Sequence, residues 1–274
     1  MKAILYDRDN KTETSFALWK KSINLYDTDT GFYESSDQQF ADVGISWGIR
    51  SSLKVQQMCL RHVVCEQGFL GNRQKNRYIG YAELTGMGKS ICPHSQITGR
   101  GEEWYGELKP LKKKKRNVVI LGQVPGDSSL FPLCEGETNN QVATYKLWMN
   151  NVISLLPKDE YEVRWKGHPY APIPNNELRG DMKWFDNLSS AFDWADIAVA
   201  FNSNSLVDAA LAGLYVIPAH PGSLAWSIRS SIGDYRKLSD ADRINWLDEV
   251  ASYQWSMEEI SSGKCWGHIR AYGK

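Results

Sequence analysis

Three polar segments in the second half of the chain carry the residue types best suited to chemistry. Each directly follows a short apolar run of the kind that forms a buried parallel strand. The segments are residues 123–129, 166–169 and 202–205. Because the carboxyl ends of parallel strands line one crevice of an open sheet, we expect the three segments to meet there. Their histidine, amides, hydroxyls and carboxylate are suited to holding a phosphate and a ribose.

The expected contacts differ by residue type. His168, held by the rigid Pro169, can donate a hydrogen bond to a phosphate oxygen. The turn at residues 202–205 can take a second phosphate oxygen, and Asp208 can accept a hydrogen bond from a ribose hydroxyl. A His-Pro pair is common by chance, so a purely structural role is the alternative. The candidate nucleotide-binding residues are Gln123, Asp127, Ser128, His168, Pro169, Asn202, Ser203, Asn204, Ser205 and Asp208.

The segment 196–217 indicates how one of these turns is built. An apolar run at residues 197–200 predicts a strand, and the amides and hydroxyls after it can cap a helix. Gly213 is suited to end that helix, and residues 214–217 predict the next strand. The N-terminus of such a crossover helix favours an anion because its N–H groups have no helical partner. A capped helix in an ordinary α/β domain would show the same pattern.

Composition excludes several protein classes. The chain has 274 residues and is 42% hydrophobic, enough for one large domain or two small ones. No apolar run approaches the roughly 20 residues that a membrane helix needs, and the N-terminus lacks the apolar core of a signal peptide. We therefore expect a soluble, cytoplasmic protein. The five cysteines form no CxxC pair, which indicates reduced structural thiols rather than a zinc site.

The pattern predicts two α/β halves joined by a charged segment. Residues 110–117 contain four lysines and an arginine without an apolar face, which predicts a domain boundary. The expected domains are residues 1–111 and 117–274. Residues 69–100 are rich in glycine and aromatic residues without a helical period, which predicts loops and short strands.

Apolar runs and capping residues predict the individual elements. Ser239 with Asp242 resembles a capping box that has aspartate in the usual glutamate position. Strands are expected at residues 3–6, 43–50, 62–65, 118–121, 161–165, 197–200 and 214–217. Helices are expected at about 12–23, 51–60, 139–156 and 188–192, after residue 205, after residue 239 and near residue 257.

Charge is unevenly distributed although the net charge is zero. Residues 50–116 hold 14 Lys and Arg against 5 Asp and Glu. Such a segment can face a polyanion, or it can be partly a solvated linker, since residues 112–116 alone supply five of the positive charges. Residues 86–90, Gly-Met-Gly-Lys-Ser, suggest a P-loop, but Glu83 stands where that motif needs its first glycine. An NTPase is therefore excluded.

At residues 166–169 and 202–216 the chain resembles nucleotide-sugar glycosyltransferases of the GT-B architecture, especially the capsule-polysaccharide and sialyl/Kdo-transferase type. In that family a His-Pro after a strand and an Asn-Ser-Ser-like turn before a helix bind the donor nucleotide. The resemblance covers residues 117–230, and the first half fits by architecture as the acceptor-side domain. It implies an α/β fold of two Rossmann-like domains facing each other across a cleft, and a UDP- or CMP-linked sugar as substrate without a further cofactor.

One departure from the family concerns the donor sugar. The acidic motif of sialyltransferases, two acidic residues and a glycine, is missing, and residues 134–136, Cys-Glu-Gly, match it poorly. A sialyl donor is therefore not expected.

The acceptor is expected to be DNA. In its short chain and its basic acceptor half, the protein resembles phage enzymes that glycosylate hydroxymethylated pyrimidines in DNA. In such a reaction the target base must leave the stack to reach the sugar. Arg50, Arg73 and Arg77 would then contact donor or DNA phosphate. The alternatives are a glycosyltransferase of surface or capsular polysaccharide synthesis and a non-catalytic nucleotide- or DNA-binding protein.

The expected mechanism needs no metal ion. The sequence has no DxD motif, and histidine, serine and backbone N–H groups can stabilise a leaving phosphate. If the reaction inverts the anomeric centre, a carboxylate of the first half should deprotonate the acceptor. Strand-end candidates for this base are Glu66 and Asp7, with Asp42 behind them; a surface carboxylate is the alternative for Glu66.

Overall fold

The chain forms two compact α/β units in the computed structural model. The first unit comprises Met1–Gly106 with Ile244–Lys274, and the second comprises Glu107–Arg243. The structure describes residues 3–6, 13–25, 40–48, 55–71, 76–81, 89–90, 98–105, 108–134, 141–170, 183 and 185–272. Each unit is built on its own sheet.

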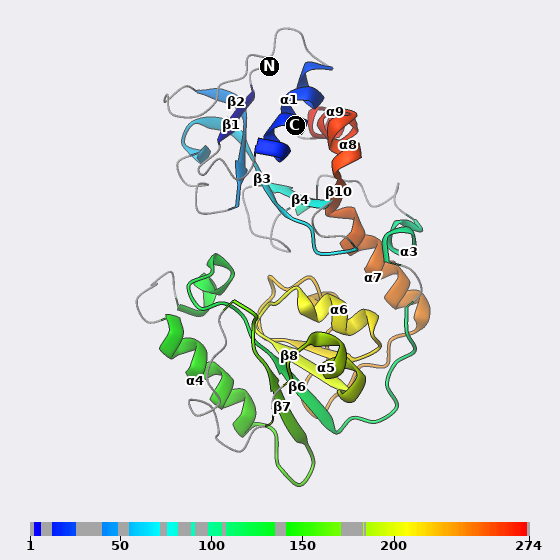
Figure 1. Cartoon of the computed structure of the whole chain (residues 1–274). Helices are drawn as coiled ribbons and strands as arrows, with labels where there is room; N and C mark the ends of the chain where they lie inside the picture. The colour runs from blue at the N-terminus through cyan, green and yellow to red at the C-terminus, as the bar shows by residue number, and fades with distance from the viewer. Residues whose placement is uncertain are drawn as a thin grey trace. The chain divides into compact units, whose positions relative to one another are not determined.

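The second unit has a four-stranded, all-parallel sheet in the order β7-β6-β8-β9. Helix α4 lies on one face of this sheet, and α5 and α6 lie on the other (Figure 1). Its elements are β6 (Asn117–Leu121), η2 (Ser128–Cys134), α4 (Gln141–Ser154), β7 (Glu162–Lys166), α5 (Leu188–Trp194), β8 (Ile197–Ala200), α6 (Ser205–Leu211), β9 (Tyr215–Pro218) and η4 (Trp226–Ile228). This arrangement confirms the parallel α/β organisation expected for the second half.

Burial on both faces explains why the strands of the second sheet are continuous apolar runs. Val118 and Ile120 of β6 pack in the core that α4 covers, together with Tyr145 and Met149. Val119, between them, is fully buried as well, and alternate residues of a strand point to opposite faces. Removing each such side chain from water stabilises the fold by about 1.5–3 kcal/mol.

The first unit has a mixed sheet in the order β1-β2-β3-β4-β10, with β5 paired to β4. Strands β1, β2 and β3 are parallel, whereas β4, β5 and β10 run antiparallel to their neighbours. The elements are β1 (Ala3–Tyr6), α1 (Glu13–Asn24), β2 (Ala41–Trp47), β3 (Cys59–Gln67), β4 (Asn76–Tyr81), β5 (Lys89–Ser90), α3 (Arg100–Tyr105), α7 (Asp240–Ser252), β10 (Gln254–Ser256), α8 (Met257–Ser261) and α9 (Lys264–Tyr272). The expectation of a Rossmann-like first domain is therefore correct only for its three parallel strands.

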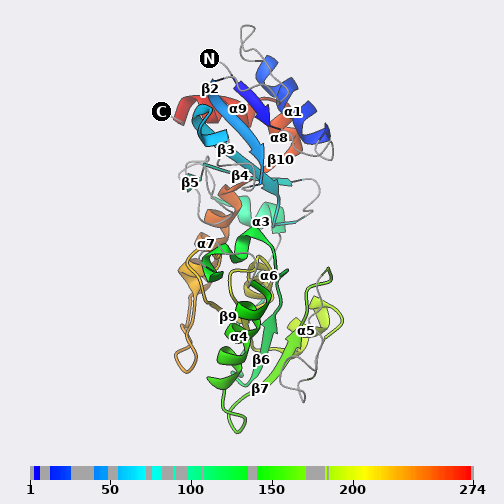
Figure 2. The ribbon, with the colours of Figure 1, turned by 90° about the vertical axis from the view of Figure 1, so that its left-hand side faces the viewer.

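The C-terminal segment belongs to the first unit, which corrects the expected domain of residues 117–274. Strand β10 pairs with β4, and α8 and α9 lie beside α1 (Figure 2). Trp255, Ile260 and Trp266 are buried in one core with Trp19 of α1. The sequence supplies an amphipathic segment here, but its partner strand lies far away along the chain.

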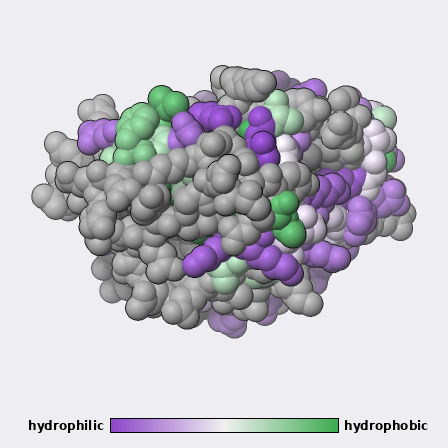
Figure 3. Space-filling view, turned by 90° about the horizontal axis from the view of Figure 1, so that it is seen from above, coloured by the Kyte–Doolittle hydropathy of each residue, from purple (hydrophilic) through white to green (hydrophobic). Residues whose placement is uncertain are grey.

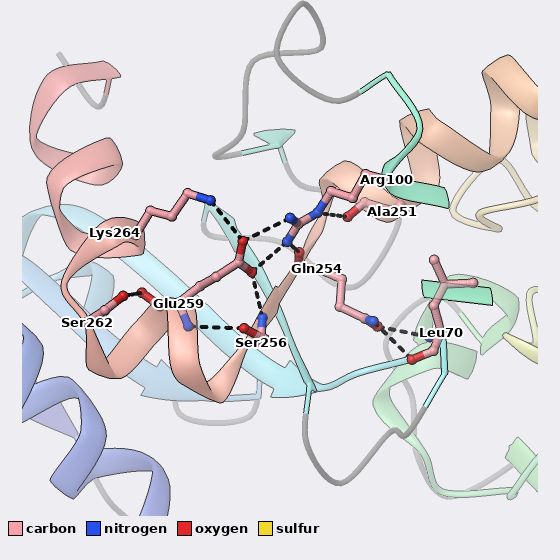
Figure 4. Close-up of polar contacts among 8 residues, drawn as sticks. All are labelled: Leu70, Arg100, Ala251, Gln254, Ser256, Glu259, Ser262 and Lys264. Atoms are coloured by element: carbon pink, nitrogen blue, oxygen red, sulfur yellow. Dashed lines mark hydrogen bonds and ion pairs between the residues drawn. The ribbon is translucent and has the colours of Figure 1, made fainter. Parts of the chain in front are cut away.

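A largely buried ion pair holds this segment to α3. Arg100 donates two hydrogen bonds to the carboxylate of Glu259, at 2.9 and 2.7 Å, and one to the Gln254 carbonyl at 2.8 Å (Figure 4). Glu259 also accepts from the Ser256 N–H in a capping box that starts α8. The Gln254 amide in turn bonds the backbone of Phe69 and Leu70. Polar contacts therefore connect segments that are more than 150 residues apart.

The charged segment before β6 packs on the second unit and does not form an isolated linker. The Lys109 N–H donates to the Leu211 carbonyl at 3.0 Å, and the Lys112 N–H donates to the Gly213 carbonyl at 2.9 Å. Gly213 has a φ of +85°, and a Cβ there would lie 2.2 Å from the Pro110 oxygen. Gly213 thus ends α6 as expected. The boundary between the units falls before residue 107 rather than at residues 111–117.

Two further local expectations have opposite outcomes. The capping box at Ser239 and Asp242 is confirmed, because the Ser239 N–H donates to the Asp242 carboxylate and the Asp242 N–H donates to the Ser239 hydroxyl, both at 3.1 Å. The helix expected through about residue 60 is wrong at its end, because β3 begins at Cys59. Pairing of β3 with β2 there outweighs the local helical pattern.

Exposed hydrophobic residues occur on several elements of both units. Leu25 follows α1, Leu60 lies on β3, and Leu147 lies on α4, each more than half exposed. On the face that Figure 3 shows, hydrophilic side chains lie between small groups of hydrophobic ones. Isolated exposed hydrophobic residues are usual on protein surfaces and do not by themselves mark an interface. Among the described residues, no helix is long and apolar enough to cross a membrane.

Candidate functional site

The carboxyl ends of the four strands of the second sheet meet at one edge, where the loop after β6 touches the loop after β7. The Gly122 N–H donates to the Lys166 carbonyl at 2.8 Å. A Cβ at Gly122 would lie 2.8 Å from the Trp165 ring and 3.0 Å from the backbone nitrogen of His168. Only glycine fits there, so the convergence expected for residues 123–129 and 166–169 is present in the structure.

A pair of buried amides joins the loops after β6 and β8. Gln123 donates from Nε2 to the Asn202 Oδ1 at 2.7 Å, and its Oε1 accepts from the Asn202 N–H at 3.0 Å. Asn202 also donates from Nδ2 to the Ser129 carbonyl at 2.7 Å. These two candidate nucleotide-binding side chains bond within the protein and hold the loops in place.

The loop that contains Asp127 is fixed in the same way. The Asp127 carboxylate accepts from the Ser129 N–H at 2.8 Å and thereby caps η2, whose first residue is Ser128. The buried Gln141 of α4 accepts from the Gly126 N–H and donates to the Asp127 carbonyl at 3.2 Å. This loop therefore presents its backbone to the sheet edge in one conformation.

His168 is oriented by its own backbone. Its Nδ1 accepts a hydrogen bond from the Tyr170 N–H at 3.2 Å, so the neutral ring carries its proton on Nε2. Burial lowers the pKa of His168, as does the positive charge of Lys166, while Asp127 opposes this shift. At neutral pH, His168 is therefore an oriented, uncharged N–H donor. The neighbouring Pro169 and Tyr170 are exposed.

Lys166 adds a cation beside His168. It is nearly buried at the end of β7 and donates from Nζ to the Gly167 carbonyl at 2.6 Å. Burial lowers the pKa of Lys166, and the negative charge of Asp186 opposes that shift. A cation and an oriented N–H donor next to each other suit an anionic group such as a phosphate.

The turn before α6 places its polar groups at the same edge. The Ser203 hydroxyl oxygen accepts from the Ser205 N–H at 3.3 Å, which leaves the Ser203 hydroxyl proton for another acceptor. Asn204 is the N-cap residue but makes no side-chain capping bond. Asp208 lies in the first turn of α6 and is partly buried. Because α6 has only seven residues, the side chains here matter more than a helix dipole.

Sequence reasoning did not select His220, which lies at the same sheet edge after β9. Its backbone N–H donates to the Phe201 carbonyl at 3.0 Å, and its imidazole ring stacks on the Phe201 ring with centroids 5.2 Å apart. The available signal was a second His-Pro pair, His220-Pro221, after a strand. His220 and His168 thus stand at the ends of the two outer strands of the sheet.

The first unit holds the remaining described candidates. Glu66 lies near the end of β3, half-buried, opposite Tyr78 of β4. Arg77 of β4 lies with its guanidinium 5.4 Å from the centroid of the Trp47 ring. Asp42 lies on β2. Asp7, Arg50 and Arg73 are outside the described residues.

Histidine, cysteine and acidic side chains do not gather into a potential metal site anywhere in the described part of the chain. Cys59, Cys65 and Cys265 are buried in the first unit, and burial raises the pKa of the Cys65 thiol to about 12. A thiol with so high a pKa is a poor metal ligand and nucleophile.

Comparison with solved structures shows what fold the chain shares. The KpsC β-Kdo 2,7 transferase of Thermosulfurimonas dismutans aligns with a TM-score of 0.55 and 16% identity, covering 98% of this chain and 99% of that one. The KpsC β-Kdo 2,4 transferase of the same organism aligns with a TM-score of 0.54 and 13% identity, covering 93% and 92%. No protein-family model and no curated protein matches the sequence. The chain therefore shares its fold, over almost its whole length, with two Kdo transferase structures.

Proposed function

We propose that the chain is a nucleotide-sugar glycosyltransferase with a glycan of a surface or capsular polysaccharide as acceptor. The observation that carries the proposal is His168, an oriented N–H donor beside Lys166, at the sheet edge of a fold shared with Kdo transferases. The GT-B arrangement, with the two units facing each other across a cleft, is part of this proposal.

In the proposed reaction the second unit stabilises the leaving group. The acceptor oxygen attacks the anomeric carbon, and the bond from that carbon to the phosphate oxygen breaks. The phosphate then accepts hydrogen bonds from His168 Nε2 and the Ser203 hydroxyl while Lys166 balances its charge. Asp208 accepts from the ribose. Gln123, Asn202 and Asp127 act by holding the loops that carry these groups.

The first unit supplies the base in this proposal. Glu66 is the described candidate and Asp7 the second; the one that acts takes the proton of the acceptor hydroxyl as the new bond forms. Protein donors carry the leaving charge, so a metal ion is not required for the step.

A DNA acceptor remains the second candidate because residues 50–116 carry 14 basic against 5 acidic residues. Such an excess can follow a phosphate backbone, and affinity for DNA would then fall steeply with salt. The glycan is preferred because the two similar structures are Kdo transferases.

The test is a transfer assay with both classes of acceptor. The protein is incubated with CMP-Kdo, UDP-glucose or UDP-N-acetylglucosamine, together with a Kdo-terminated oligosaccharide or hydroxymethylated duplex DNA, and products are identified by mass spectrometry. We expect transfer to the oligosaccharide and its loss in His168→Phe. Transfer only to DNA would replace the glycan by the second candidate.

The same assay can reject the hypothesis that the chain is a glycosyltransferase. The control variant His268→Phe changes a histidine that packs on Trp255 in the first unit and should leave transfer unchanged. If no sugar nucleotide of the panel binds or turns over, the chain is not a glycosyltransferase for these donors. Nucleotide binding without transfer or hydrolysis would favour a non-catalytic nucleotide-binding protein.

A further inference from the structure

His220 has the same local geometry as His168. Its Nδ1 accepts from the Gly222 N–H at 3.0 Å, as His168 Nδ1 accepts from the Tyr170 N–H. In both cases the acceptor bond at Nδ1 leaves the proton of the neutral ring on Nε2. The sheet edge therefore carries two oriented imidazole N–H donors.

Packing fixes the direction of the His220 ring. One face of the ring stacks on Phe201, with an angle of 24° between the planes. The Phe201 and Trp148 rings form a T-shaped pair with centroids 5.9 Å apart. The Trp148 ring in turn stacks on the buried Tyr145 ring with centroids 5.5 Å apart. The His220 side chain is only partly buried. A rigid aromatic series thus supports a histidine that keeps an accessible surface.

The surroundings of the two histidines differ in charge. His168 has the Lys166 cation beside it, whereas burial alone lowers the pKa of His220, whose ring stacks on Phe201 and accepts from the Gly222 N–H. An uncharged N–H donor suits a polyhydroxylated group, whose hydroxyl oxygens accept hydrogen bonds. The charged end suits a phosphate.

The strand order separates the two donors. His168 follows β7 and His220 follows β9, the outer strands of the order β7-β6-β8-β9. Neighbouring strands lie about 4.8 Å apart, so the ends of β7 and β9 are about 14 Å apart. This backbone spacing is several times the length of one hydrogen bond, about 3 Å. A ligand longer than a phosphate, such as a nucleotide-sugar, therefore suits the two donors together.

From this arrangement we infer that His220 binds the sugar of the nucleotide-sugar donor through its Nε2–H, at the opposite end of the site from the phosphate at His168. The inference rests on the proposed function and adds a sugar subsite to it. His220 then contributes to recognising the intact donor and not the free nucleotide.

The test compares binding of an intact donor with binding of its nucleotide. Dissociation constants are measured by calorimetry for CMP-Kdo against CMP and for UDP-glucose against UDP. His220→Phe keeps a ring on Phe201 but removes the N–H, whereas His220→Gln restores an N–H donor near the Nε2 position. His268→Phe serves as the matched control for replacing a histidine that packs on an aromatic ring.

We expect His220→Phe to weaken the intact donor about tenfold, the size of one hydrogen bond, and to leave the free nucleotide unchanged. His220→Gln should recover most of the loss, and His168→Phe should weaken both ligands. Equal weakening of donor and nucleotide in His220→Phe, or no weakening of either, overturns the sugar subsite while the proposed function stands. If the wild type binds no member of either pair, the proposed function fails, and the subsite fails with it.

Discussion

The two units use buried polar groups for different purposes. In the first unit, Arg100, Glu259 and Gln254 join α3, the end of β3 and the C-terminal segment. In the second unit, Gln123 and Asn202 join the two loops at the carboxyl edge of the sheet. The first network closes a fold whose chain leaves the unit and returns. The second holds loops that present groups to solvent, which is how a binding site is preorganised.

The histidines show the same contrast. His62 of β3 is buried and shares a 2.7 Å hydrogen bond with the buried Ser46 of β2. His168 and His220 are bonded through Nδ1 and are only partly buried. A histidine enclosed between strands contributes to stability, whereas one at a sheet edge can meet a ligand.

The largest expected effect comes from breaking the network of the first unit. Glu259→Ala leaves the Arg100 guanidinium without its carboxylate, on a side chain that is only 13% exposed. We expect a loss of about 3 kcal/mol in the free energy of unfolding, measured by urea titration with tryptophan fluorescence. Nucleotide affinity of the folded protein should not change.

The matched control is Glu162→Ala, which removes the partner of Arg164 in a more exposed pair. Its expected cost is below about 1 kcal/mol because water screens such pairs. A similar loss in both variants would show that the Arg100 pair is not a special element of the first unit.

His62 should make stability depend on pH. Burial lowers the pKa of His62 from 6.5 to about 4, so between these values the unfolded chain takes up a proton that the folded chain does not. The contribution of neutral His62 to the free energy of unfolding is therefore fully present above pH 6.5. It falls by about 3 kcal/mol as the pH drops to 4. Urea titrations across this range measure the slope, and His62→Gln should flatten it. An equal slope in that variant would assign the effect to other groups.

Removing the amide pair of the second unit should affect both stability and binding. Asn202→Ala removes the donor to the Ser129 carbonyl and leaves the Gln123 Nε2 with only its longer bond, 3.4 Å, to the Ser129 hydroxyl. We expect the free energy of unfolding to fall by about 2 kcal/mol. Nucleotide affinity should fall severalfold, because the loops are no longer held together. If Asn202→Ala destabilises the protein but binds nucleotide as the wild type does, the proposed preorganisation is wrong.

Gly122→Ala should lower the free energy of unfolding by no more than Asn202→Ala does. The added Cβ would clash with the Trp165 ring and with the backbone nitrogen of His168, so the loop after β7 must move. The expected cost is about 1–2 kcal/mol, together with weaker nucleotide binding by calorimetry. The control is Gly233→Ala, where φ is +81° and nothing lies within 4 Å of the new Cβ. That variant should strain the backbone and leave nucleotide binding unchanged.

Local pattern was sufficient for the strands and α-helices of the second unit and for the start of α7, but it did not predict η2 and η4. The apolar runs at 118–121 and 197–200 are β6 and β8, and the expected stop at Gly213 and capping box at Ser239 are present. These features depend on residues close together in the chain, such as strand burial, a left-handed glycine and a side chain that bonds a backbone N–H nearby. The convergence of residues 123–129 with 166–169 also followed from the rule for parallel strands.

The sequence by itself therefore determined the parallel α/β organisation of the second unit and which polar residues stand at its strand ends. Only the tertiary structure decided the rest. It joined β10 to β4, paired Gln123 with Asn202 across 79 residues, and brought His220 to the edge that holds His168. Periodicity records which face of an element is apolar but not which distant element covers it, because that choice depends on packing of the whole chain.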